Sequence, residues 1–319
     1  MPGGYAHITL INAMRERVDA RADIPINVKI ALGDYLGFCE LGGVSPDYPY
    51  LDVLDLNAAS WADYMHYLNT GAMIQAGVQR VSAMSGAQQS KCLAWLMGYS
   101  AHFIADVTIH PIVELKVGEY ADNKMDHRIC EMHQDSYIFQ RLNLSKIGLS
   151  EHLDKENGGI MSCHHPEDVD RIDASIHDLW DAMLQEVHPG AYAQNAPNID
   201  SWHAKFGSRV DLIEEGSALP AFARHVAVNA GLTYPEPQEI DNASFIEALK
   251  TPEGPMHYDD IFNRALDNVA QVWAWIGQDV SARTLERVNA IGDWNLDTGR
   301  DEAGSLVFWT EPTGGEIEP

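Results

Sequence analysis

The sequence predicts an all-α fold for this chain of 319 residues. Two observations carry the prediction. Apolar residues recur with the spacing of helix faces along most of the chain, and no clear alternating run typical of a β-strand competes with them. The stretches with helical spacing are 6–20, 26–40, 58–83, 86–112, 124–142, 167–188, 203–216, 220–231 and 258–289.

Loops rich in proline, glycine and asparagine separate these helices at 41–56, 154–166, 189–201 and 232–257. We expect residues 1–195 to form a helical core that carries the motifs described below. Residues 196–300 are predicted as additional helices packed on that core within the same domain. Residues 301–319 are predicted as an acidic tail, whose last part, TEPTGGEIEP, has the composition of a disordered segment.

Charge and cysteine usage limit the function classes. The formal net charge of −26 argues against a nucleic-acid backbone as the main partner. Bound divalent cations would weaken that argument, because they add positive charge at the site itself. No CxxC pair is present, so we predict free, mostly buried thiols at Cys39, Cys92, Cys130 and Cys163.

The N-terminal residues MPGGYAHITL lack the basic start, long apolar segment and cleavage site of a secretory signal. No apolar run approaches the roughly 20 residues that span a bilayer. We therefore expect a cytoplasmic protein, with export by another route left open.

The stretch AHFIADVTIHP, 101–111, carries three polar residues at steps of four within an apolar helix: His102, Asp106 and His110. Residues four apart share a helix face and lie about 6 Å apart along the axis. The two histidines are therefore about 12 Å apart, too far to share one small ion. If all three are ligands, this helix serves two ions, with Asp106 between them.

A second helix repeats the pattern in DHRICEMHQD, where His127, Glu131 and Asp135 again follow at steps of four. Two helices with ligand faces can enclose a metal cluster in a bundle. The alternative is a set of hydrogen-bonded core residues and helix-face ion pairs. The apolar surroundings favour metal, because buried ionisable groups without a partner are costly.

The stretch LMGYSAHFIADVTIHP, followed by HRICE, resembles the zinc-dependent phospholipase C family, which is structurally akin to the S1/P1 nucleases. The match is specific across about 95–136 and weaker elsewhere. The resemblance implies an all-helical bundle of that type, with a cluster of two or three zinc ions. It also points to three upstream ligands: His7 in GGYAHITL, Asp47 in GGVSPDYPY and His66 in WADYMHYL.

The resemblance implies three ion sites. The first would use Asp47, His66, His102 and Asp106; the second His110, His127 and Glu131; the third His7 with Asp106 as a bridge. Nitrogen and carboxylate ligands without thiolate suit zinc. Asp52 and Asp55 compete with Asp47 for the loop position, but the Gly-…-Pro-Asp context favours Asp47.

Two features depart from the family pattern. Secreted members use an N-terminal tryptophan at the third ion, whereas this chain starts Met-Pro-Gly-Gly-Tyr. The spacing between Asp106 and His110, directly before Pro111, is tighter than in the secreted phospholipases. The occupancy of the third site therefore stays open.

Other polar and aromatic residues have weaker assignments. Asp135 is either an acceptor for a ligand histidine or a surface carboxylate, and His133 is predicted at the surface. MSCHHPEDVD, 161–170, is predicted as a loop before a helix rather than a second metal motif. Tyr48, Tyr50 and Tyr234 lie in loops that either pack ordinarily or line a choline or lipid pocket.

The function implied by the resemblance is hydrolysis of a phosphate ester, most directly by a phospholipase C-like phosphodiesterase. Clustered zinc ions activate water and offset charge on the phosphoryl group, with Asp47 orienting or deprotonating that water. The expected partner is a small-molecule or lipid phosphoester, with transient contact to a membrane surface and no stable nucleic-acid partner. The alternatives are a nuclease or nucleotidase on the same scaffold, and a repurposed metal-binding helical protein with other chemistry.

Overall fold

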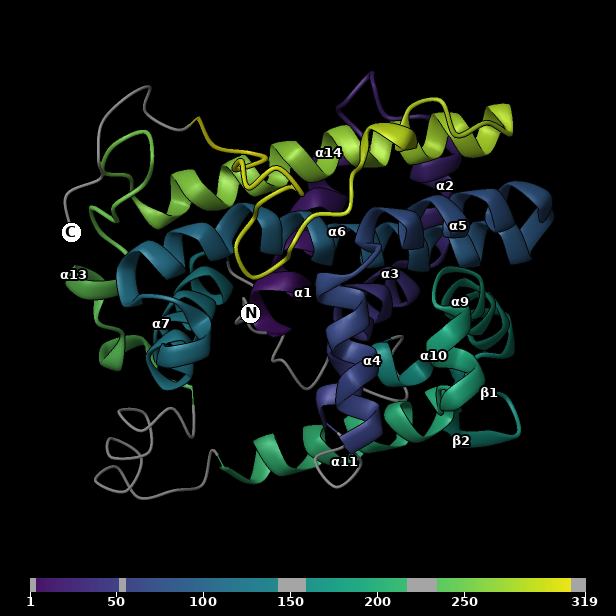
Figure 1. Cartoon of the computed structure of the whole chain (residues 1–319), viewed down its shortest axis with the longest axis horizontal. Helices are drawn as coiled ribbons and strands as arrows, with labels where there is room; N and C mark the ends of the chain where they lie inside the picture. The colour runs from purple at the N-terminus through teal and green to yellow at the C-terminus, as the bar shows by residue number, and fades with distance from the viewer. Residues whose placement is uncertain (1–3, 52–55, 143–158, 217–233, 311–319) are drawn as a thin grey trace.

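The structure, a computed structural model, describes residues 4–51, 56–142, 159–216 and 234–310. These residues form a helical bundle with one small sheet (Figure 1), which confirms the predicted all-α fold. The predicted helix at 220–231 and the competing carboxylates Asp52 and Asp55 lie outside the described residues.

The long helix α6, Gly86–Val117, runs through the centre of the molecule (Figure 1). Every residue from Cys92 to Val113 is buried, so the helix has no solvent-exposed face over this stretch. By length and composition α6 could cross a membrane, which the sequence analysis did not expect, but its apolar window is wholly buried inside the protein. A core helix of a globular protein has these properties.

Helices surround α6 on several sides. α3, Leu36–Val44, and α14, Tyr258–Ala282, make extensive contact with it, and α1, α2, α5, α7 and α9 also touch it. The bounds of these five helices are Gly4–Val18, Ile26–Asp34, Thr70–Ala83, Tyr120–Arg141 and Ala174–Val187. The ligand-bearing face of α6 is therefore enclosed by other elements of the chain.

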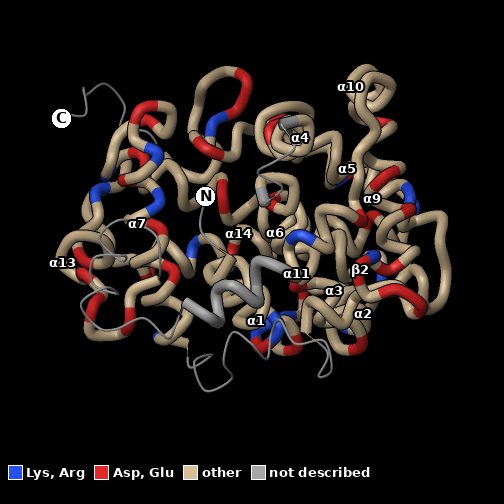
Figure 2. Tube along the Cα trace, turned by 90° about the horizontal axis from the view of Figure 1, so that it is seen from below, with Lys and Arg blue, Asp and Glu red and all other residues tan. Residues whose placement is uncertain are grey.

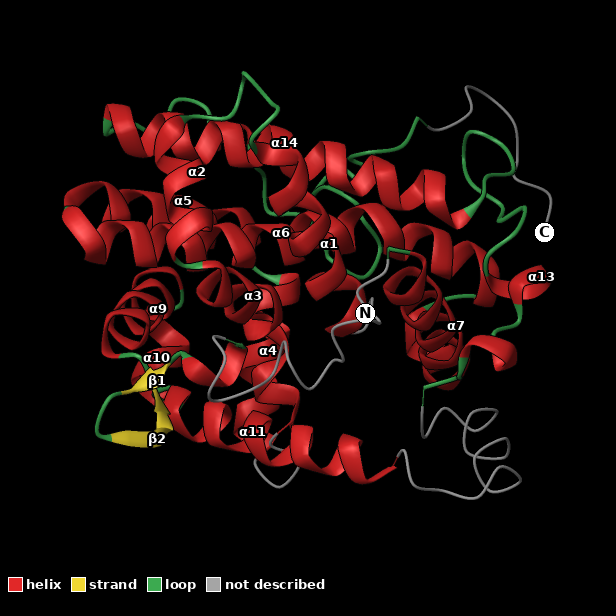
Figure 3. Ribbon diagram, turned by 180° about the vertical axis from the view of Figure 1, so that it is seen from behind, coloured by secondary structure: helices red, strands yellow, loops and turns green. Residues whose placement is uncertain are grey.

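Further elements complete the bundle. Helix α4, Leu56–Tyr67, packs with the 3-10 helix η1, Ser45–Leu51, and α11, Ile199–Gly216, also contacts η1. The short helices are α10, Pro189–Gln194, and α13, Asn242–Phe245, with 3-10 turns η3, η4 and η5 at Ile160–Ser162, Pro237–Glu239 and Val288–Ala290. Figure 3 shows the only sheet of the described residues, an antiparallel pair of β1, His164–His165, and β2, Asp168–Ile172.

The sheet corrects one sequence prediction. Residues 161–170 form a 3-10 turn and a hairpin rather than a loop, and the helix expected from 167 begins at Ala174. The side chain of Asp173 accepts a hydrogen bond from the backbone N–H of Ser175 and caps this helix. The acidic residues 167–170 therefore precede the helix instead of forming its first turn.

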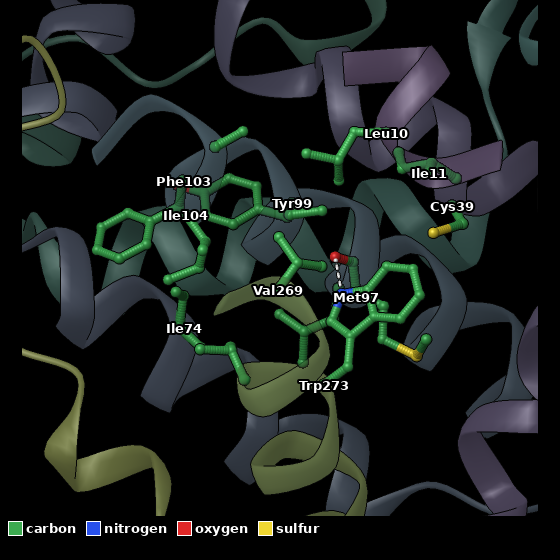
Figure 4. Close-up of a cluster of buried hydrophobic side chains, with 14 of the residues drawn as sticks. Leu10, Ile11, Cys39, Ile74, Met97, Tyr99, Phe103, Ile104, Val269 and Trp273 are labelled. Atoms are coloured by element: carbon green, nitrogen blue, oxygen red, sulfur yellow. Dashed lines mark hydrogen bonds between the residues drawn. The ribbon is translucent and has the colours of Figure 1, made fainter. Parts of the chain in front are cut away.

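Residues on both sides of position 195 share one hydrophobic cluster. Figure 4 shows a part of it, where Trp273 of α14 lies among side chains of α6 and its indole N–H donates to the carbonyl of Met97 over 2.9 Å. The division at 195 stays a prediction. Within the segment predicted as an acidic tail, residues 301–310 are described, and Trp309 is 5% exposed.

Acidic residues are scattered over the trace in Figure 2 rather than gathered into one block. The four cysteines are buried and unpaired, as predicted.

Two glycines set the distance between α3 and α6. A Cβ built at Gly98 would overlap the backbone carbonyl oxygen of Cys39, and one built at Gly42 would overlap that of Trp95. The two backbones are therefore in direct contact, as only glycine permits. This close approach brings the carbonyl of Gly43, at the end of α3, next to His102.

We predict that Gly98→Ala destabilises the fold by about 3 kcal/mol, because the new methyl group meets backbone rather than a movable side chain. Gly33→Ala is the matched control: Gly33 is also helical, and nothing lies within 4 Å of a Cβ built there. That substitution should be neutral or stabilise by up to about 1 kcal/mol. Chemical unfolding of both variants measures the difference, and equal midpoints would contradict the close approach.

Candidate metal centre

Asp106 lies at the centre of a buried cluster. Its Oδ2 is 3.2 Å from Nε2 of His102, one turn earlier on α6, and its Oδ1 is 3.3 Å from Nε2 of His7 on α1. The Asp106 and His102 side chains are wholly buried, and His7 is 1% exposed. Each carboxylate oxygen therefore faces a different histidine, which is the arrangement of a bridging ligand.

Two further elements bring ligands to the same place. His66 of α4 and Asp47 of η1 approach with 3.4 Å between Nε2 and Oδ1, and the same Oδ1 is 3.9 Å from Nε2 of His102. Two overlapping sets offer ligand atoms that all lie within 4.8 Å of one another. One set is His66, His102 and Asp106, and the other is His7, Asp47 and His102.

Backbone carbonyls fix which ring nitrogens are free. Nδ1 of His66 is 2.7 Å from the carbonyl oxygen of Ala62, and Nδ1 of His102 is 2.9 Å from that of Gly43. Because a carbonyl oxygen only accepts, both Nδ1 atoms carry the hydrogen. In the neutral rings both Nε2 atoms then carry no hydrogen and present a lone pair. These two Nε2 atoms face each other at 3.3 Å. Two lone pairs so close repel unless a cation lies between them.

The same region holds several of the buried polar atoms that find no hydrogen-bond partner in the described residues. Buried polar groups are normally paired, so such atoms need a separate explanation. A divalent cation would supply it here, because nitrogen and carboxylate oxygen are zinc ligands. The unpartnered atoms in the cluster are both ring nitrogens of His7, Oδ1 of Asp47, both carboxylate oxygens of Asp106 and Nε2 of His110.

The second predicted set is looser. Nε2 of His110 is 3.9 Å from Oε1 of Glu131 on α7, while Nδ1 of His110 is 2.7 Å from the carbonyl oxygen of Leu296. Nε2 of His127 donates to the carbonyl oxygen of Gly118 over 2.6 Å, which leaves Nδ1 as its ligand atom. Among the described residues His127 joins neither of the two compact sets.

Burial and neighbouring charges shift the titration of these groups in different directions. Burial alone would raise the pKa of Asp106, but His102 and His110 outweigh it and hold the pKa well below the usual value. Burial would likewise raise the pKa of Asp47, but His102 and His66 outweigh this effect and lower it. Burial raises the pKa of Glu131 to about 8 and lowers that of His110. A low pKa keeps the shared carboxylates charged and ready to bind a cation.

Asp47 is the most exposed of these four residues. Its side chain is 22% exposed, whereas those of His66, His102 and Asp106 are wholly buried. The Oδ1 atom of Asp47, which faces the histidines, is itself buried, so the exposed part of this side chain lies on the other side of the carboxylate.

The structure decides between the alternatives for Asp135 and Tyr48 and corrects the assignment of His133. Asp135 is wholly buried, and it accepts a hydrogen bond from the hydroxyl of Tyr234 over 3.4 Å, so it is not a surface carboxylate. His133 is 5% exposed rather than at the surface, because it stacks on Phe245 and accepts from the backbone N–H of Asp241. Tyr48 is a core residue, with no exposed surface.

The acceptors behind the ligands were not among the residues predicted from the sequence. The carbonyls of Ala62, Gly43 and Leu296 orient three histidines, and no side-chain motif marks a carbonyl. Asp297 was not predicted either; it accepts from the hydroxyl of Tyr67 over 2.7 Å and lies 3.8 Å from Nδ1 of His110. Only the Ala62 acceptor, one turn before His66, could be inferred from helix spacing.

Comparison with known families agrees with the resemblance. Residues 6–190 match the family model described as zinc dependent phospholipase C. The matched span covers more than half of the chain and includes all the candidate ligands from His7 to Glu131. Searches of curated proteins and of solved structures found no match.

We predict that Asp106→Ala reduces bound zinc from two or three ions per chain to at most one, because a single carboxylate contacts ligands on both α1 and α6. The matched control is Asp126→Ala, which removes an exposed carboxylate on α7. Elemental analysis of purified protein, dialysed against a fixed free zinc concentration, gives the count. An unchanged count in Asp106→Ala would mean that the cluster does not bind zinc through this residue.

We also predict that zinc binding at Glu131 depends on pH. The pKa of about 8 in the folded protein lies above the usual value of roughly 4.3, so the apo carboxyl keeps its proton below about pH 8. Because the folded apo protein binds this proton more tightly than the unfolded chain, its free energy of unfolding falls as pH rises between these two pKa values. Zinc has to displace the proton, and affinity at this site should rise roughly tenfold from pH 7 to pH 9.

Competition with a zinc chelator at pH 7, 8 and 9 measures this affinity in wild type and in Glu131→Gln. The variant should lose the weaker zinc ion at every pH. A wild-type affinity that is equal at the three pH values would contradict a protonated Glu131.

Proposed function

Because the chain belongs to the zinc-dependent phospholipase C family, we propose that it hydrolyses phosphate esters with two or three bound zinc ions. One observation carries the proposal. Buried histidine nitrogens and carboxylate oxygens from α1, η1 and α6 converge with His66 of α4, and those of His7, Asp47, Asp106 and His110 include atoms without a hydrogen-bond partner among the described residues. A merely structural cluster would satisfy these atoms within the protein.

For the individual ions we propose the ligand sets that the family resemblance implies. Asp47, His66, His102 and Asp106 hold the first ion, and His7 with Asp106 contributes to another. His110, His127 and Glu131 hold the remaining ion. The wider spacing of that last trio makes it the weaker site, because its ligand atoms have to move together when the ion binds.

Bound zinc supplies the chemistry of a Lewis acid: it lowers the pKa of water and offsets the negative charge of the phosphoryl oxygens. Asp47 has the most exposed side chain among the ligands of the first ion, and His102 and His66 keep it ionised. Its carboxylate can orient an incoming water and accept the proton that the water loses on attack. His66, His102 and Asp106 hold their positions because the bundle encloses them.

For the substrate we propose a phospholipid with a cationic head group, such as phosphatidylcholine. The ring of Tyr50 lies 5.5 Å from the ring of His66, and its hydroxyl donates to Asp63 over 2.9 Å. An aromatic face beside carboxylates favours a cation. The net charge of −26 favours a zwitterionic lipid over a nucleic acid as partner.

We predict that the zinc-loaded protein hydrolyses phosphatidylcholine in mixed micelles and loses this activity with a chelator, and that zinc restores it. Asp47→Asn should lower kcat by about 10²–10⁴-fold, because the proton acceptor is lost. Asp34→Asn, an exposed carboxylate on α2, is the control and should retain full activity. Release of phosphocholine is the measurement.

The same assay separates the alternatives. Zinc-loaded protein that cleaves a nucleotide or single-stranded DNA but no phosphodiester lipid would replace the proposal with a nuclease or nucleotidase. Zinc-loaded protein that is inactive on all of these substrates would favour a metal-binding protein with other chemistry.

A further inference from the structure

A C-terminal segment returns to the metal centre from outside the matched residues. Residues 291–309 follow α14 and lie beyond residue 190, where the family match ends. Leu296, 1% exposed, is hydrogen-bonded to two candidate ligand residues at once. Its N–H donates to the carbonyl of His66 over 3.0 Å, and its carbonyl accepts from Nδ1 of His110 over 2.7 Å. The segment therefore connects α4 and α6 at the two ion sites.

The contact with His110 selects its ligand atom. Since the Leu296 carbonyl takes the Nδ1 hydrogen, the neutral ring presents a bare Nε2 toward Glu131. His66 and His102 obtain the same orientation from carbonyls within the matched residues. His110 is thus the histidine of this trio whose orientation depends on the C-terminal segment.

Several contacts hold the segment in place near Leu296. Asp293 accepts from the backbone N–H groups of Gly71 and Ala72 at the start of α5, over 2.9 and 3.1 Å. The ring of Trp294 stacks on Phe103, next to His102, with 5.5 Å between centroids.

The far end of the segment is attached to α6 as well. The indole N–H of Trp309 donates to the carbonyl of Thr108 over 2.8 Å. The guanidinium of Arg264 lies over the same indole ring, 4.0 Å from its centroid. Both ends of the segment are therefore anchored around the ligand-bearing part of α6.

Asp297 is the residue that holds Leu296 against the site. Its Oδ2 accepts from the hydroxyl of Tyr67, the neighbour of His66, and its backbone N–H donates to the side chain of Asn295. Its Oδ1 is 3.8 Å from Nδ1 of His110, so its negative charge also favours a basic imidazole.

We propose that residues 291–309 are a positioning element of the metal centre, in which the Tyr67–Asp297 hydrogen bond holds the Leu296 carbonyl that orients His110. This inference rests on the proposed function, since it concerns the ion bound by His110 and Glu131. Loss of the hydrogen bond would lower the affinity for that ion, while the ion at His66, His102 and Asp106 would stay bound. Metal sites commonly lose about 10–100-fold in affinity when such a partner behind a ligand is removed.

The test uses the full chain and measures zinc affinity in competition with a chelator. Asp297→Ala and Tyr67→Phe should each lower the affinity for the zinc ion at His110 and Glu131 by about 10–100-fold, without changing the affinity for the most tightly bound ion. Asp297→Asn keeps an oxygen that accepts from Tyr67 and should restore much of the affinity, which a general loss of stability would not allow. Glu302→Ala removes an exposed carboxylate from the same segment and is the control, with wild-type affinity.

Cobalt(II) in place of zinc adds a spectroscopic readout of the coordination of the second ion. Its visible absorption should change in Asp297→Ala and Tyr67→Phe and return toward wild type in Asp297→Asn. Circular dichroism and thermal unfolding show that each variant is folded.

Two results overturn the inference, and they differ in what else they affect. Zinc affinities of Asp297→Ala and Tyr67→Phe equal to wild type would exclude a positioning role while leaving the proposed function intact. A wild-type chain that binds no zinc would overturn the proposed function and this inference together.

Discussion

The structure depends on one electrostatic constraint: the central helix carries ionisable groups where no water reaches them. Asp106 and His102 have no exposed surface, and His110 has almost none. An isolated charge in such a place costs several kcal/mol, of the order of the net stability of a whole domain. The elements packed around this helix place further candidate ligands against these groups: His7 from α1, His66 from α4 and Asp47 from η1. A bound cation would therefore complete the core of this fold as well as its candidate reaction site.

Most of the helices and the candidate ligands on α6 and α7 were accessible from the sequence because both follow a simple periodicity. The family resemblance, not periodicity, pointed to His7, Asp47 and His66. Steps of four placed His102, Asp106 and His110 on one face, and the structure brings Asp106 next to His102 as that spacing requires. The ion assignments themselves remain proposals. Features set by long-range packing were not accessible. His133 is buried by Phe245, more than a hundred residues away, and the hairpin at 164–172 has too few residues for a strand pattern.

The precision of the site comes from the backbone. Three histidines present Nε2 to the cluster because carbonyls of Ala62, Gly43 and Leu296 take the hydrogens of their Nδ1 atoms. The Gly43 carbonyl reaches His102 only because Gly42 and Gly98 let α3 and α6 touch. Side-chain patterns reveal such partners poorly, since every residue type has the same carbonyl group. Gly42 and Gly98 can be read from the sequence, but their role becomes evident only once the packing of α3 against α6 is known.

The contact between His110 and Leu296 joins residues separated by 186 positions. During synthesis the ribosome makes α6 long before it makes the acceptor for His110, so the nascent chain has the motif without the orientation of its last histidine. Contacts of such separation form late, because the intervening chain has to be ordered first. A chain truncated before Leu296 would therefore carry the His110 motif without the carbonyl that orients its ring.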